Sequence, residues 1–199
     1  MKWNTATIFA VFCTAAVTIA VVSMAALSLP QFIYERSSNE FMPAVVPSTI
    51  KLTSSAFENN GRLPAIYTCD GRGTSPPLTI SGVPTGTQSL TLVLHDPDAP
   101  STLGFDHWVA FNIDPATTAI SEGQVPVGTS GKNDNGGLGY FGPCPPLGTH
   151  HYIFMVYAVD GMLPLSEGAS KADVFKAMQG HVLDQARLVG MYGKLQPKQ

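Results

Sequence analysis

Charged side chains are scarce in this sequence. Lys and Arg number 11 and Asp and Glu 14 among 199 residues, which gives a net charge of −3 at pH 7. Lys and Arg do not cluster anywhere along the chain. A nucleic-acid-binding surface needs a basic patch that neutralises backbone phosphates, so the composition argues against a nucleic-acid partner.

Motifs for metal binding and for serine hydrolysis are missing as well. The sequence has no HxH, HExxH or CxxC spacing, the patterns with which His and Cys commonly hold zinc. It has no G-x-S-x-G turn, which would expose an activated serine. We therefore expect no metal and no cofactor. A weak hydrolase is kept as an alternative, with Asp96 orienting His107 as a base.

Cysteine occurs only three times. Cys13 lies in an apolar leader, so Cys69 and Cys144 are the only pair in the remainder of the chain. If the domain is exported, these two can form a disulfide; otherwise they are two free, partly buried thiols. The sequence leaves both alternatives open.

The first 29 residues are strongly apolar. After Lys2 no charge occurs before Glu35. The apolar run is long for a signal peptide and about long enough for a membrane span. Both interpretations predict export, to the periplasm or to a membrane-anchored position facing the periplasm or the outside. Residues 30–48 read as a linker because they are polar and interrupted by proline, and one domain is expected over 49–195.

Proline and glycine are abundant, with 16 and 19 copies. They favour many short strands and fixed turns over long helices. Strand patterns occur at 50–52, 65–67, 89–95, 104–114 and 150–157. Ser170 to Asp173 is typical of a helix start, and apolar residues continue at helical spacing to Val189. We therefore expect a β-rich body followed by a small helical tail, weakened or split at Gly180.

Two segments have the polar character of a binding site. The strand at 89–95 runs into Asp96 and Asp98, which alternate with prolines. Residues 139–157 form a glycine- and proline-rich loop followed by a strand with two histidines. The backbone N–H groups of such a loop, an imidazole and a tyrosine hydroxyl are all able to donate to the oxygens of a phosphate.

Strand alternation predicts which of these side chains share a face. His150 and Tyr152 should lie together, and His151 should point the other way. By the same argument His107 should share a face with Val109, Phe111 and Ile113. We expect His95 and His151 to be structural histidines with satisfied hydrogen bonds.

Five ordered motifs resemble the phosphatidylethanolamine-binding protein family. They are YTCDGRGTSPPL (67–78), DPDAP (96–100), the Asp-His-Trp segment (106–108), GYFGPCPPLGTHHYIFMVYAVD (139–160) and GHVLDQARLVGMY (180–192). The similarity is greatest to the bacterial branch called Raf-kinase-inhibitor-like and covers residues 50–193.

The resemblance implies a mainly β fold: β-sandwich-like antiparallel sheets with peripheral short helices and a C-terminal helical segment. It also implies a small pocket for phosphate, phosphorylethanolamine or acetate-like anions. The residues that match the family's pocket are Asp96, Asp98, His107, Gly142, Pro145, His150 and Tyr152.

The function expected from this resemblance is non-catalytic binding of a small anion or a phospholipid headgroup. An alternative is an interaction module that inhibits a protease or a kinase pathway, with the pocket as its regulatory site. Export would place cytosolic kinases out of reach, which argues against a kinase partner.

Overall fold

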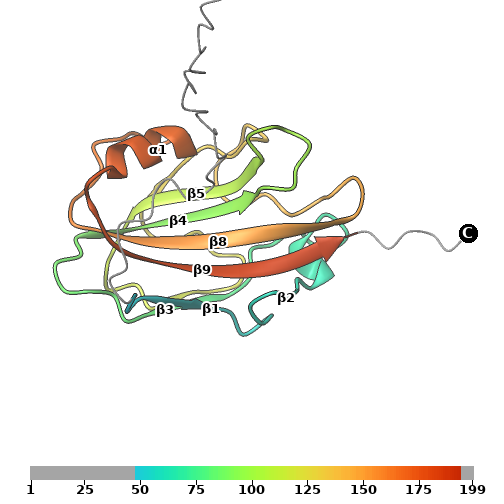
Figure 1. The fold of residues 1–199 in the computed structure, drawn as a ribbon, viewed down its shortest axis with the longest axis horizontal. Helices are drawn as coiled ribbons and strands as arrows, with labels where there is room; N and C mark the ends of the chain where they lie inside the picture. Colours follow the sequence, from blue (N-terminus) through green and yellow to red (C-terminus); the bar gives the residue numbers. More distant parts are fainter. Residues whose placement is uncertain (1–47, 194–199) are drawn as a thin grey trace, which may run out of the picture. The chain divides into compact units, whose positions relative to one another are not determined.

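A six-stranded sheet and a three-stranded sheet enclose the main hydrophobic core of the domain (Figure 1). The computed structural model describes residues 48–193, all of which belong to one compact unit. The predicted export segment at 1–29 and nearly all of the predicted linker lie outside these residues. None of the helices within 48–193 has the length and apolar character that crossing a membrane requires.

The large sheet has the strand order β2-β9-β8-β4-β5-β7. Its strands are β2 (Gly61–Arg62), β4 (Ser89–Asp96), β5 (Phe105–Ile113), β7 (Thr129–Ser130), β8 (Thr149–Val159) and β9 (Val182–Gly193). The small sheet has the order β1-β3-β6, from β1 (Lys51–Thr53), β3 (Leu78–Ser81) and β6 (Ala119–Ile120). All pairs are antiparallel except β2 with β9. The predicted mainly β fold is confirmed.

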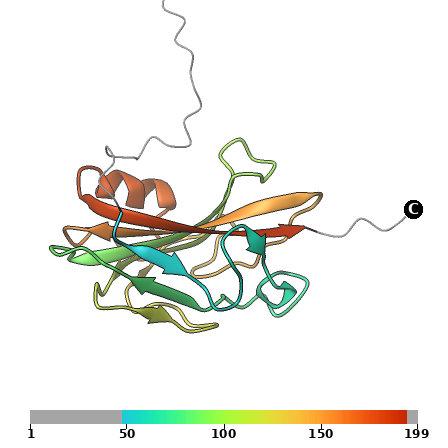
Figure 2. The ribbon, with the colours of Figure 1, turned by 60° about the horizontal axis from the view of Figure 1, so that its bottom comes forward.

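The large sheet is buried on both faces along its centre. One face packs on the small sheet through alternate residues of β4 and β8, among them Leu92, Leu94 and Phe154, which are fully buried. The short helix α1 (Lys171–Met178) covers the other face and buries Val174 and Met178 (Figure 2). Burial on both faces extends to the polar positions of β4, since Ser89 and Thr91, which alternate with Leu90 and Leu92, are also fully buried.

The helix begins where the sequence predicts and ends earlier. Ser170 accepts a hydrogen bond from the Asp173 backbone, and Asp173 bonds back to Ser170, which forms a capping box. After Met178 the chain turns through Gly180, whose φ of +80° suits glycine. The expected helix through Val189 is wrong, because residues 182–193 form β9.

Long-range pairing decides the conformation of β9. It pairs with β8 along its whole length, from Val182 opposite Val159 to Gly193 opposite Thr149. Such pairing outweighs a weak local helical spacing, since β-propensity depends on cross-strand neighbours. The strand expected at 65–67 is also wrong: Ala65–Tyr67 is one turn of 3₁₀ helix that follows Pro64.

Candidate functional site

A small cavity is lined by residues from the end of β4 and the start of β8. Figure 1 shows that these two strand ends lie at the same end of the large sheet. Its volume is about 120 Å³. At roughly 30 Å³ per water molecule, this space suits a group of a few heavy atoms. Its lining residues are Asp96, Ala99, Pro100, Phe105, His107, Phe141, Cys144, Pro145, Pro146, His150 and Tyr152. Five of the seven predicted site residues are among them: Asp96, His107, Pro145, His150 and Tyr152.

Asp96 orients His150 at the base of this cavity. Its Oδ2 atom lies 2.8 Å from Nδ1 of His150, and both side chains are buried. The other carboxylate oxygen accepts the backbone N–H of Asp98 at 2.9 Å. Because Nδ1 of His150 donates to the carboxylate, Nε2 is the ring nitrogen left for a ligand.

His107 reaches the cavity through a β-bulge. Leu94 lies opposite Trp108, whereas the next β4 residue, His95, lies opposite Asp106, so His107 is an extra residue in β5. Its ring centroid lies 5.3 Å from that of Tyr152. The bulge breaks the alternation on which the sequence prediction relied.

The predicted face of His107 is therefore wrong. Val109 and Phe111 are buried outside the main core cluster, while His107 contacts Tyr152, which belongs to it. Ile113 also lies in the main cluster, because a second register shift in the β4–β5 pairing falls before it. At this shift the backbone of Asn112 has a φ of +55°.

A backbone carbonyl fixes the tautomer of His107. Its Nδ1 atom lies 2.8 Å from the carbonyl oxygen of Phe141, to which it donates. Burial lowers the pKa of His107 below the usual 6.5, despite the opposing effects of the Phe141 carbonyl and the Asp96 charge. At neutral pH the imidazole is uncharged, with Nε2 as a bare acceptor.

Tyr152 supplies a buried hydroxyl that lies near the Asp96 carboxylate. The side chain is fully buried, and its Oη atom forms no hydrogen bond of regular geometry among the described residues. Burial raises the pKa of Tyr152, and the nearby Asp96 charge raises it further, so the group stays protonated. An unsatisfied buried hydroxyl costs free energy, which a ligand oxygen would offset.

Strand alternation in β8 agrees with the prediction. His150 and Tyr152 are buried on the cavity side, whereas His151 is half exposed. His151 instead holds Asp98, whose Oδ2 atom accepts from its Nδ1 at 2.7 Å and from its backbone N–H at 2.8 Å. Burial alone would raise the pKa of Asp98, but the bonds from His151 lower it. Asp98 does not line the cavity.

The proline-rich segment forms one wall of the cavity and is tied to a neighbouring loop. The Sγ atoms of Cys69 and Cys144 are 2.07 Å apart, as in a disulfide. The Cys69 N–H also donates to the Pro143 carbonyl at 3.0 Å. Gly142 lies outside the cavity lining. A Cβ there would lie 3.3 Å from the backbone of Thr68, so its small size serves the packing of the two loops.

His95 belongs to a separate cluster behind the site. Its Nδ1 atom lies 2.7 Å from Oδ1 of Asp106, which also pairs with the Lys171 ammonium at 2.5 Å. Burial acts to raise the pKa of Asp106, but the bonds from His95 and Lys171 lower it. The predicted structural role of His95 agrees with this arrangement, which joins β4 and β5 to α1.

The geometry does not form the pair on which the hydrolase alternative depends. Asp96 bonds to His150 and not to His107, and Nδ1 of His107 is bound to a carbonyl. The pairing of Asp96 with His107 that the hydrolase alternative requires is therefore not formed. Within residues 48–193, no three His, Cys, Asp or Glu side chains are grouped so as to hold a metal ion.

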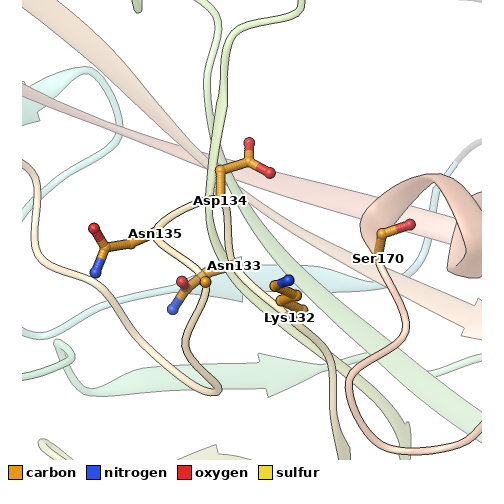
Figure 3. Close-up of a pocket in the computed structure, with 6 residues that line it drawn as sticks. Lys132, Asn133, Asp134, Asn135 and Ser170 are labelled. Atoms are coloured by element: carbon orange, nitrogen blue, oxygen red, sulfur yellow. The ribbon is translucent and has the colours of Figure 1, made fainter.

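A larger hollow near the start of α1 is less suited to a ligand. Its volume is about 380 Å³, and Figure 3 shows polar side chains around it. Asn133 is the only buried residue that lines this hollow. Its side-chain amide donates to the Gly139 carbonyl and accepts from the Gly137 N–H. One Asp134 oxygen accepts the backbone N–H of Asp106 at 2.7 Å. The hollow offers no buried polar atom without a partner.

Several lining residues were not predicted from the sequence. They are apolar or small: Ala99, Pro100, Phe105, Phe141, Cys144 and Pro146. The aromatic pair packs around His107, with centroid distances of 4.7 Å from Phe105 and 5.9 Å from Phe141. Five of the six stand inside the quoted motifs at 96–100 and 139–160, and Phe105 directly precedes the Asp-His-Trp segment, so these motifs are the sequence signal for them. Cys144 was itself predicted as a possible disulfide partner.

The site thus belongs to a β protein with a small, partly apolar pocket holding two histidines, a carboxylate and a tyrosine. A sequence profile of the phosphatidylethanolamine-binding protein family matches residues 53–193. The chain belongs to this family, as its motifs indicated.

Known proteins of similar sequence and structure agree. A UPF0098 protein of Methanothermobacter thermautotrophicus is 51% identical over 149 residues, covering 72% of this chain and 98% of that protein. The crystal structure of CT736, a phosphatidylethanolamine-binding protein homologue from Chlamydia trachomatis, superposes with a TM-score of 0.71 at 38% identity, covering 74% of this chain and 99% of the other. The crystal structure of YbcL from E. coli superposes with a TM-score of 0.70 at 32% sequence identity. The match covers 74% of this chain and 100% of YbcL.

Proposed function

We propose that this protein binds a small phosphate-bearing ligand, either a free anion or a phospholipid headgroup, without transforming it. The observation that carries the proposal is the Tyr152 hydroxyl, which is fully buried beside the cavity and forms no regular hydrogen bond among the described residues, although it interacts with the nearby Asp96 carboxylate. A ligand oxygen is the natural partner for such a donor.

The two histidines define which ligands fit. Each uses Nδ1 as a donor to the protein, so Nε2 is the free nitrogen of both rings. A neutral Nε2 accepts a hydrogen bond and a protonated one donates. The pocket therefore suits a group that carries both acceptors and a proton, such as hydrogen phosphate or the phosphate of phosphorylethanolamine.

Binding is favoured over catalysis because the cavity lining offers no free thiol and no activated hydroxyl as a nucleophile. The only sulfur that lines it, from Cys144, is engaged in the disulfide. Its hydroxyl, on Tyr152, has a raised pKa and is a poor nucleophile. Turnover of phosphate esters or carboxylate esters by the purified chain would contradict this part of the proposal.

Export is proposed as well. A disulfide persists in oxidising compartments such as the periplasm and is rare in the cytosol. The placement of Cys69 and Cys144 and the apolar leader together support an extracytoplasmic setting. Fractionation of the native host, followed by mass spectrometry of the intact chain, tests it and reports whether the leader is removed.

The binding test is titration calorimetry with phosphorylethanolamine. We expect His150→Ala to weaken binding roughly tenfold or more, since it removes a charge-assisted hydrogen bond. His181→Ala is the matched control, because His181 pairs with Asp160 on an exposed surface and lines no part of the cavity. Equal affinity for wild type and His150→Ala would overturn the proposal.

A further inference from the structure

The loop after β4, residues 97–104, forms one wall of the cavity but packs weakly on the domain. Ala99 and Pro100 of this loop line the cavity. Six of its eight residues are exposed, Ala99 is partly buried, and only Gly104 at its end is buried. Pro97 and Pro100 have no backbone N–H and cannot donate a hydrogen bond. Apolar packing therefore contributes little to the position of this loop, which depends on the few hydrogen bonds that it makes.

Asp98 makes every hydrogen bond that joins this loop to the rest of residues 48–193. Its backbone N–H donates to Oδ1 of Asp96 at 2.9 Å, at the end of β4. Its Oδ2 atom accepts from the backbone N–H of His151 at 2.8 Å and from Nδ1 of the same residue at 2.7 Å, at the start of β8. The further hydrogen bonds of the loop all end on Ser101 within it.

The start of β8 is bound from both of its faces. His150 points to the cavity side of β8 and pairs with Asp96. His151 points to the opposite side and pairs with Asp98. The chain between the two carboxylates therefore crosses the end of β8. Ala99 directly follows Asp98, so the bonds to His151 fix the point at which the cavity wall begins.

We propose that Asp98 and His151 are positioning residues, which hold residues 97–104 in place as a wall of the cavity and thereby raise the affinity of the cavity for its ligand. Neither side chain lines the cavity. The inference rests on the proposed function and adds what keeps its site in shape. A loop that is ordered before binding loses less conformational entropy when the ligand arrives, which makes the free energy of binding more favourable.

The effect of the pair should be local. The side chains of His151 and Asp98 are 50% and 41% exposed, and an exposed ion pair contributes little to the stability of a whole domain. A loop with few contacts opens independently of the core, however, and the loss of one bond directly raises the population of its open form. Amide exchange within the loop is therefore the most sensitive measure.

Three variants remove and restore the contacts in steps. His151→Leu removes the bond from Nδ1 and keeps the bond from the backbone N–H. Asp98→Ala removes both. His151→Asn restores a side-chain donor, because the amide nitrogen of Asn takes nearly the position of Nδ1. Hydrogen exchange of the full chain, read by mass spectrometry in residues 98–104, should be roughly threefold faster in His151→Leu, roughly tenfold faster in Asp98→Ala and close to wild type in His151→Asn.

Affinity for phosphorylethanolamine, measured by calorimetry, should fall in the same order, by roughly twofold in His151→Leu and roughly fivefold in Asp98→Ala. His151→Asn should recover the wild-type value. Amide exchange in β4 and β8 should be unchanged in all three variants, because these central strands exchange through opening of the whole sheet. A role of the pair in global stability alone would instead speed exchange in both strands.

His181 and Asp160 supply the matched control. Their Nδ1 and Oδ1 atoms are 2.8 Å apart, their side chains are 57% and 41% exposed, and neither lines the cavity. His181→Leu and Asp160→Ala therefore remove a pair of the same chemistry and similar exposure. Both variants should leave loop exchange and affinity at the wild-type values.

Two results would contradict the inference. One is exchange in residues 98–104 that is as slow in Asp98→Ala as in the wild type. The other is wild-type affinity in Asp98→Ala although its loop exchanges faster. If the wild type binds no phosphorylethanolamine, the proposed function fails, and loop exchange in the stated order still supports the pair as the contact that holds the cavity wall.

Discussion

The Nδ1 atom of His150 lies 2.8 Å from Oδ2 of Asp96, with both side chains buried at the cavity wall. This hydrogen bond places a proton on Nδ1 of His150, since the carboxylate can only accept. With Nδ1 committed to the carboxylate, Nε2 accepts when the ring is neutral and donates when it is protonated. His107 has the same arrangement through the Phe141 carbonyl. The pocket therefore changes from accepting to donating as its histidines gain protons.

Sulfate and phosphate should respond differently to pH. Sulfate carries no proton across about pH 5 to 8, so beyond the Tyr152 hydroxyl it gains further side-chain donors only from protonated histidines. Because the pKa of His107 lies below 6.5 in the free protein, sulfate affinity should rise as pH falls below that value. Phosphate, which brings its own proton, should still bind at neutral pH. Calorimetry with both anions checks this, and parallel profiles for the two anions would contradict it.

Replacing Tyr152 by Phe should weaken binding without loss of stability. The substitution removes one oxygen that forms no regular hydrogen bond among the described residues and interacts with the nearby Asp96 carboxylate. We expect phosphorylethanolamine affinity to fall roughly fivefold, the value of one hydrogen bond. The free energy of unfolding in urea should stay within about 1 kcal/mol of wild type or increase, because an unsatisfied buried group is removed. A large loss of stability would show that the hydroxyl is bonded within the protein.

Reduction of the disulfide should affect both stability and the pocket. It joins residues 75 apart in sequence, and closing such a loop stabilises the folded state by about 4 kcal/mol in the chain-entropy account. Residues 144–148 make no backbone hydrogen bond with the rest of residues 48–193. The disulfide is thus their main tether.

We therefore expect a dithiol reductant to lower both the urea midpoint and phosphorylethanolamine affinity. The Cys69→Ser, Cys144→Ser double variant should start at the lower values and be insensitive to the reductant. If the reduced wild-type protein keeps its full phosphorylethanolamine affinity, packing alone holds residues 144–148 in place and the prediction is wrong.

Asp106→Asn should destabilise the domain. Asp106 is the carboxylate shared by His95 and Lys171, and its side chain is 13% exposed. Removing one partner of a buried ion pair leaves the other uncompensated, at a cost of roughly 3 kcal/mol. Asp160→Asn is the control, since its pairing with His181 is exposed and should be worth about 0.5 kcal/mol or less.

The same carboxylate predicts a loss of stability in acid. The pKa of Asp106 is lower in the folded protein than its usual 3.8. The stabilisation is present above 3.8 and is lost as pH falls from there through the folded pKa, because the unfolded chain takes up the proton first. Urea unfolding across this range should show a smaller slope with pH for Asp106→Asn than for wild type.

Sequence patterns predicted the parts of the site that follow regular alternation. His150 and Tyr152 share the buried face of β8, and His151 points outward, as period-two spacing requires. The helix start at Ser170 followed from a local hydrogen-bonding motif. In these cases neighbouring residues carry all the necessary information.

Features that depend on distant pairing were not predictable in this way. The helical spacing of residues 182–189 does not reveal that β8 is available to pair with them. The exposed position of Asp98 depends on His151, which lies 53 residues away in sequence. The assignment of His107 to a strand face failed because a bulge depends on how two strands are paired.

That bulge gives the pocket an unusual vulnerability. His107 and Trp108 are neighbours in the chain, yet both lie on the core side of the sheet. His107 contacts Tyr152 of the main core cluster, and Trp108 is buried in the same cluster. The placement depends on the number of residues in β5 as much as on their identity. Deleting one residue here would restore alternation and withdraw the imidazole from the cavity with no side chain substituted. Among related chains, a one-residue gap at this point is expected to mark loss of the pocket even where both histidines remain.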